Sequence, residues 1–176
     1  MSRGTAEAIL CGDELPRFEI AQEQKPREFG LFVVLPFGVQ HDAREPMGFL
    51  IRHRATGETA LYATDTYYLR FTFTCVHYWI VECNFTERLL QAQLERGELS
   101  ARLYNRLTRS HMSLRRLVDA LHANDLTDTR AIVLVHLSDE RSDEREMVDT
   151  IRNETGIDSI FAANAGDVIP LELHPF

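Results

Sequence analysis

Short apolar runs separated by polar and glycine-containing segments dominate the first half of the chain. Three of these runs have the length and the β-branched and aromatic content of strands, at 31–39, 47–53 and 59–63. The last two are separated by a short turn that contains Gly57, and this spacing predicts a hairpin. An edge strand is predicted at 17–21, before a charged loop. The first half is therefore predicted to consist mostly of strands.

The second half alternates strand and helix patterns. Apolar residues spaced at i, i+3, i+4 and i+7 predict helices that follow Thr86, that surround 99–107 and 114–121, and that run from near Ser142 to Gly156. Continuous apolar runs predict buried strands at 78–81, 131–135 and 157–162. The last two strands and the helix between them form a βαβ unit, which favours parallel pairing. The whole pattern predicts a mixed α/β fold.

Length and composition restrict the kind of protein. A chain of 176 residues with 44% hydrophobic content is long enough to bury one core, so we expect a single domain over 1–176. The chain contains no apolar run near the roughly 20 residues that cross a bilayer, and its first ten residues lack the apolar core of a secretory signal. We therefore expect a cytoplasmic protein that does not contact membranes.

The charge of the chain opposes non-specific binding to nucleic acid. A net charge of −8 repels a polyanion, because neutralising phosphates requires a surplus of lysine and arginine. A nucleic-acid substrate would therefore be held locally. One basic patch interrupts the acidic sequence and consists of Arg102, Arg106, Arg109, Arg115 and Arg116. The alternative interpretation of this patch is a solvated helix surface.

Polar side chains follow three of the predicted strands. His41 and Asp42 end one strand, Asp65 follows the hairpin, and His136 ends the first strand of the βαβ unit. Ligands of open α/β sheets gather beyond the carboxyl ends of strands, where loops bring polar groups together. Two imidazoles and one carboxylate suit a borderline divalent cation such as zinc or manganese. The sequence therefore indicates a metal site formed by His41, Asp65 and His136.

Each of these three residues also has a purely structural interpretation. His41 would be a strand-end histidine bonded to a neighbouring carbonyl, and His136 a hydrogen-bonded core histidine. Asp65 lies between two threonines and would form an Asx turn or cap a helix. The joint pattern favours the metal site more than any one residue does.

Six short segments occur in a characteristic order. They are His-Asp at 41–42, Gly-Phe-Leu-Ile at 48–51, Tyr-Ala-Thr-Asp-Thr at 62–66, Ile-Val-Glu-Cys-Asn at 80–84, His-Met-Ser at 111–113 and His-Leu-Ser at 136–138. In this order they resemble the later part of a metallo-β-lactamase-fold hydrolase, and most of all the phage and bacterial branch related to single-strand exonucleases. The resemblance covers nearly the whole chain. It implies an αββα sandwich of which this chain forms an incomplete, C-terminal portion.

The resemblance also implies a role for each matched residue. His41 is similar to the family's third metal motif, Asp65 to its bridging aspartate and His136 to its last histidine, so these three would bind up to two zinc or manganese ions. Asp65 and His111 would be the catalytic residues of a phosphodiesterase or nuclease-like hydrolase. His111 would contact the phosphate or protonate the leaving oxygen, and Asp42 would orient a metal ligand.

The family's signature, His-x-His-x-Asp-His, does not occur in this sequence. We therefore expect that the N-terminal part of the fold is missing and that hydrolysis is impaired or depends on a segment that carries this signature. The alternatives are a chain that still binds one metal ion and a catalytically inactive interaction or regulatory protein of phage origin. Phe32, Val34 and Phe37 would face the absent layer, which predicts a homodimer or a complex with an N-terminal partner.

Overall fold

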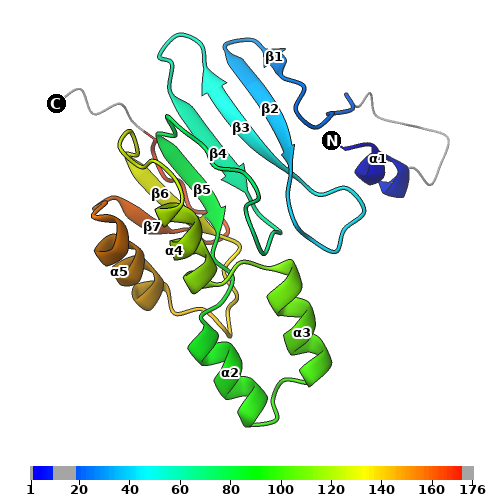
Figure 1. Cartoon of the computed structure of the whole chain (residues 1–176), viewed down its shortest axis with the longest axis vertical. Coiled ribbons are helices and arrows are strands. Elements are labelled where there is room, and N and C mark those ends of the chain that lie inside the picture. The colour runs from blue at the N-terminus through cyan, green and yellow to red at the C-terminus, as the bar shows by residue number, and fades with distance from the viewer. Residues whose placement is uncertain (1, 10–18, 172–176) are drawn as a thin grey trace.

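The computed structural model describes residues 2–9 and 19–171, and Figure 1 shows how their helices and strands are arranged. In chain order the elements are α1 (Arg3–Ile9), β1 (Arg27–Phe29), β2 (Phe32–Gly38), β3 (Met47–His53), β4 (Thr59–Ala63), β5 (Tyr78–Glu82), α2 (Glu87–Glu95), α3 (Ala101–Ser110), α4 (Leu114–His122), β6 (Ala131–Val135), α5 (Glu144–Thr155) and β7 (Ile160–Ala162). The first half is mostly strand and the second half alternates helix and strand, as predicted.

The described strands form one mixed sheet in which spatial order follows chain order, from β1 to β7. Neighbours from β1 to β4 pair antiparallel, and neighbours from β4 to β7 pair parallel. Parallel strands end at the same edge of a sheet. The carboxyl ends of β4, β5 and β6 therefore lie side by side.

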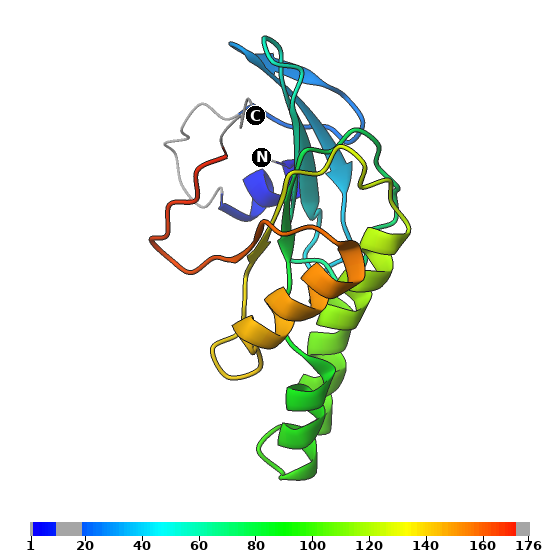
Figure 2. The same cartoon turned by 90° about the vertical axis from the view of Figure 1, so that its left-hand side faces the viewer.

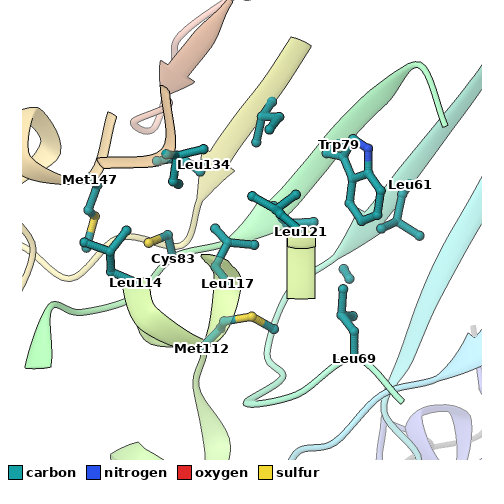
Figure 3. Close-up of a cluster of buried hydrophobic side chains, with 14 of the residues drawn as sticks. Leu61, Leu69, Trp79, Cys83, Met112, Leu114, Leu117, Leu121, Leu134 and Met147 are labelled. Carbon is teal, nitrogen blue, oxygen red and sulfur yellow. The ribbon is translucent and has the colours of Figure 1, made fainter. Parts of the chain in front are cut away.

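Helices α4 and α5 lie against one face of the sheet, whereas α2 and α3 project beyond its edge (Figure 2). Figure 3 shows the core between these layers, in which Leu117 and Leu121 of α4 and Met147 of α5 pack with Trp79 and Leu134 of the sheet. All five side chains are fully buried. Burying one such side chain stabilises the fold by about 1.5–3 kcal/mol. This core fixes the positions of the strand ends that carry the polar residues.

The opposite face of the sheet carries a continuous apolar row. Cross-strand pairing aligns Pro36, Phe49, Tyr62, Ile80, Val133 and Phe161 across β2 to β7. Among the described helices, α1 alone lies toward this face (Figure 2). Tyr62 is 39% exposed and Phe161 is 40% exposed. The described residues thus form one sheet with helices mainly on one side.

One expectation about the open face is wrong. Phe32 and Val34 lie on it, but Phe37 lies on the helix-covered face, where it is only 5% exposed and its ring packs with those of Phe71 and Phe73. Successive side chains of a strand alternate between faces, so residues separated by three or five positions cannot share one.

The strands predicted at 47–53, 59–63 and 131–135 have the predicted bounds, those predicted at 31–39 and 78–81 differ by one residue at one or both ends, and the one predicted at 157–162 begins only at Ile160. The predicted edge strand is wrong. Residues 19–21 are not in a strand, and residues 17 and 18 lie outside the described part of the chain. The edge strand is β1, because Gly30 has a φ of +58° and allows the tight turn that folds Phe29 back onto Phe32. Within the described residues, no helix is both long enough and apolar enough to span a bilayer.

Candidate metal centre

The carboxyl ends of the three adjacent parallel strands each deliver one acid or imidazole. Asp65 lies two residues beyond β4, Glu82 is the last residue of β5, and His136 follows β6 directly. His111 joins them from the junction between α3 and α4. Ligand atoms of these four side chains all lie within 4.8 Å of one another.

Sharp backbone turns direct two of these side chains to the site. Asp65 and His136 have φ values of +51° and +58°, in the left-handed region that residues other than glycine rarely adopt. Such a conformation costs about 1–3 kcal/mol and persists where neighbouring contacts enforce it. The side-chain amide of Asn84 donates to the His136 carbonyl at 2.7 Å, and the backbone N–H of Thr66 donates to Glu82 at 2.7 Å. Both turns are therefore held by the segment at the end of β5.

The same segment positions His111. This residue follows α3 as its C-cap in an extended conformation, and Ser113 is the N-cap of α4, with a hydroxyl that accepts from the backbone N–H of Arg116. Between them, the carbonyl of the buried Met112 accepts from the backbone N–H of Asn84 at 2.8 Å. The short link between the two helices is thus tied to the end of β5, beside Glu82.

Glu82 is fully buried, and its carboxylate organises the cluster. One oxygen, Oε1, lies 2.7 Å from Nδ1 of both His111 and His136, and Oε2 accepts from the Thr66 N–H. Burial raises the pKa of Glu82, but the hydrogen bonds from both imidazoles and from Thr66 outweigh it, so the net pKa lies below the usual value. An ionised carboxylate can only accept, so each imidazole carries a proton on Nδ1.

The contact with Glu82 also changes the pKa of His136. Its hydrogen bond to Glu82 raises the pKa of His136, partial burial opposes this effect, and the negative charges of Glu82 and Asp65 reinforce it. The cluster thus favours a protonated ring when no other cation is near.

Asp65 has a different spacing from the imidazoles. Its Oδ1 lies 3.8 Å from Nε2 of His41, 3.8 Å from Nδ1 of His111 and 3.7 Å from Nδ1 of His136. These distances are too long for hydrogen bonds, but two metal–ligand bonds of about 2.0–2.2 Å each can span them. Carboxylate and imidazole donors also match the preferences of a borderline divalent cation. The arrangement therefore fits a metal ion that takes the place of an Nδ1 proton and lies between Asp65 and the imidazoles.

His41 stands beside the four-residue group. The backbone N–H of Ala43 donates to its Nδ1 at 3.0 Å, so a neutral His41 ring carries its proton on Nε2, the atom that faces Asp65. Asp42 lies 3.2 Å from the same Nδ1. The imidazole of His41 is 5.4 Å from that of His111, measured between ring centroids. Its role as a ligand requires loss of the Nε2 proton and stays a prediction.

The structure brings together all four residues that the sequence indicated: His41, Asp65, His111 and His136. Glu82 was not predicted as a ligand, although it follows the apolar run 78–81 and so occupies the same strand-end position as the others. That position was the signal that identifies it.

Comparison of the sequence with protein-family models and with curated proteins gives no match. Solved structures do match. The metallo-β-lactamase-fold protein YhfI of Bacillus subtilis aligns with a TM-score of 0.61 and 16% identity, over 85% of this chain and 54% of that chain. Yeast PDE1 aligns with a TM-score of 0.56 and 14% identity, over 83% of this chain and 48% of that chain.

A further match is a possible metal-dependent hydrolase from Veillonella parvula DSM 2008, with a TM-score of 0.52 and 15% identity, over 86% of this chain and 58% of that chain. The chain thus spans about half the length of these three proteins. At such low identity the likeness concerns the fold. The expected mixed α/β fold of the metallo-β-lactamase type is confirmed.

Proposed function

We propose that the protein is a metal-dependent hydrolase that cleaves phosphodiester bonds. The observation that carries this proposal is the position of Asp65, whose Oδ1 lies 3.7–3.8 Å from nitrogens of three imidazoles at the carboxyl edge of a parallel sheet. Support also comes from the metallo-β-lactamase fold and from the structural likeness to a possible metal-dependent hydrolase of Veillonella parvula.

Asp65, Glu82 and His136 would hold the ion, with His41 as an additional donor, and His111 would act on the substrate instead. A bound zinc or manganese ion lowers the pKa of water and offsets the negative charge of a phosphodiester. When Glu82 holds the proton of His111 on Nδ1, the other ring nitrogen is available to exchange a proton with the substrate. Protonated there, His111 donates to the leaving oxygen as a general acid.

The proposed hydrolytic activity would depend on further metal ligands. Asp65, Glu82 and His136 suffice for one ion, since a catalytic zinc has about three protein ligands and an open position. A second ion needs more donors, which a His-x-His-x-Asp-His segment on another part of the protein or on a partner would supply. We therefore expect low activity from residues 1–176 alone.

The proposal is tested by metal content and hydrolysis together. Protein incubated with zinc or manganese and then desalted is analysed for bound metal, and its hydrolysis of bis(p-nitrophenyl) phosphate is measured. We expect Asp65→Asn to lower both, with a rate loss on the order of tenfold to a hundredfold. Asp128→Asn, at an exposed position far along the chain, is the matched control and should change neither. Wild-type protein that retains no metal would contradict the proposal, as would an Asp65→Asn variant with full activity.

A second candidate function is that of an interaction protein without catalysis. Tyr62 and Phe161, the exposed members of the apolar row on the open face, favour it, because exposed apolar side chains of this kind mark protein contacts. In this case the face would bind a second copy of the chain. Light scattering should then report a dimer that Tyr62→Lys converts to a monomer, in protein that binds no metal. A monomeric wild type would exclude the homodimer. Binding of a separate N-terminal segment to this face would instead identify that segment as the partner.

A further inference from the structure

Helix α3 carries three arginines on one face. Arg102, Arg106 and Arg109 are all exposed, and α3 contains no acidic residue. At 100° per residue they fall within roughly a 60° arc, and they span about 10 Å along the helix. Tyr104 and Leu107, on the opposite face, pack against the small core between α3 and α2. We call these three residues the α3 arginine stripe.

The stripe begins at the metal centre and leads away from it. Arg109 lies two residues before His111, which ends the helix. Arg106 donates from Nε to Asp42 at 3.0 Å, and Asp42 is adjacent to His41. Figure 1 shows α3 running outward from this end, alongside α2 and beyond the edge of the sheet. One end of the stripe therefore borders the site and the other reaches solvent.

The charge of the stripe is only partly neutralised. Arg106 is paired with Asp42, but within the described residues Arg102 and Arg109 form no ion pair, although the chain has a net charge of −8. Of the other two arginines of the basic patch, Arg115 is exposed on α4, outside the stripe, and Arg116 has a structural role. Arg116 donates to the carbonyl of Thr108 and lies over the ring of Tyr67, so it serves the packing of α4. The stripe is thus a local positive surface on an acidic protein.

We propose that the α3 arginine stripe binds the phosphate backbone of a single nucleic-acid strand and leads it to the metal centre. This inference rests on the proposed phosphodiesterase function. Guanidinium groups bind phosphates through paired, charge-assisted hydrogen bonds. A row of guanidinium groups along a helix matches a linear polyanion, whereas a small diester at the metal centre would not reach Arg102. Repulsion by the acidic remainder of the surface confines the strand to the stripe.

Binding is measured without turnover. Protein treated with a chelator is titrated into a fluorescein-labelled single-stranded DNA of about 16 nucleotides, and anisotropy is recorded over a range of salt concentrations. The test variant is Arg102→Glu/Arg109→Glu. The matched control, Arg52→Glu/Arg145→Glu, makes the same change in net charge at two exposed positions outside the stripe. Circular dichroism checks folding, and Arg102→Gln/Arg109→Gln removes the charges without reversing them.

We expect the wild type and the control to bind alike. The stripe variant should lose affinity on the order of tenfold at low salt, and its slope of log affinity against log salt should be shallower by about 1.4, or 0.7 for each of two lost phosphate contacts. Equal losses in stripe and control variants would overturn the inference, as would a wild type that does not bind the strand. Because this assay contains no metal, failure of wild-type hydrolysis of the small diester would instead defeat the proposed function.

Discussion

Two carboxylates at opposite ends of the parallel strands are stabilised in different ways. Glu58, just before β4, accepts from the hydroxyl of Tyr78 at 3.0 Å and forms an ion pair with Arg130. Glu82, at the end of β5, accepts instead from His111 and His136. Both side chains are largely or fully buried, with 14% of Glu58 and none of Glu82 exposed. The two ends of the parallel strands thus differ mainly in the cation that faces the acid.

The pair of Glu58 with Arg130 is purely structural, whereas the cation that faces Glu82 can be exchanged. A guanidinium stays charged at every pH at which the protein is folded, so Arg130 balances Glu58 permanently. An imidazole releases its proton near neutral pH, and the same nitrogen can then bind a metal ion. Within the described residues, no lysine or arginine contacts Glu82 or Asp65. The site at the carboxyl edge therefore depends on protons or a metal ion for charge balance.

Replacing each acid by its amide should give the largest contrast. Glu82→Gln removes the negative charge and one of the two acceptor oxygens that bind Thr66 and two imidazoles, so we expect the metal-dependent hydrolysis of bis(p-nitrophenyl) phosphate to fall by about 10- to 100-fold. Glu58→Gln leaves the site intact and should change the rate less than about twofold. Steady-state rates of both variants, each saturated with the same metal, test the contrast. Similar losses in the two variants would show that the distinction between the two ends is false.

Metal binding should stabilise only proteins with an intact carboxyl edge. A ligand at about 100 times its dissociation constant adds about 2.7 kcal/mol to the free energy of unfolding. We expect zinc or manganese to raise the unfolding temperature of the wild type and of Glu58→Gln, and to have little effect on Asp65→Asn. Differential scanning fluorimetry with increasing metal measures this. A metal effect of equal size in Asp65→Asn would place the bound ion elsewhere.

The sequence was sufficient for elements with strong local patterns. The runs at β3, β4 and β6 are apolar and flanked by turn-forming or charged residues, and their bounds were predicted as observed. β1 was missed because its residues, Arg-Glu-Phe, are exposed and carry no apolar pattern. It forms only because the turn at Gly30 places it beside β2. Edge strands of this kind depend on pairing rather than on propensity.

The site was predictable only as far as strand ends are visible in the sequence. His41, Asp65 and His136 each follow an apolar run, which suggested that they meet. Glu82 also follows an apolar run, but that it meets the other three depends on the pairing of β5 with β4 on one side and β6 on the other. Those pairings join segments far apart in the chain, and no local pattern encodes them. Strand order therefore decides which acids and imidazoles share the cluster.

In the metal-free protein, Glu82 and Glu58 should also differ in how they make the free energy of unfolding depend on pH. This effect should be smaller than the two above. The pKa of Glu82 is lowered in the folded state, so its stabilisation is complete above the unfolded value of 4.5 and is lost as pH falls through the folded pKa. The pKa of His136 is raised, so its stabilisation is complete below the unfolded value of 6.5 and is lost as pH rises through the folded pKa. The cluster should therefore stabilise the protein most between these two values.

Glu58 should contribute on the acid side alone. Its burial raises its pKa, but hydrogen bonds from Thr56 and Tyr78 and the charge of Arg130 lower it by more, so its stabilisation is lost only as pH falls. Urea unfolding in the presence of a chelator, repeated from acid to alkaline pH, measures both contributions. Relative to wild type, Glu82→Gln should flatten the decline on both sides, and Glu58→Gln only the acid decline. If the alkaline decline persists in Glu82→Gln, the imidazoles are not stabilised by this carboxylate, and the two ends of the parallel strands are alike.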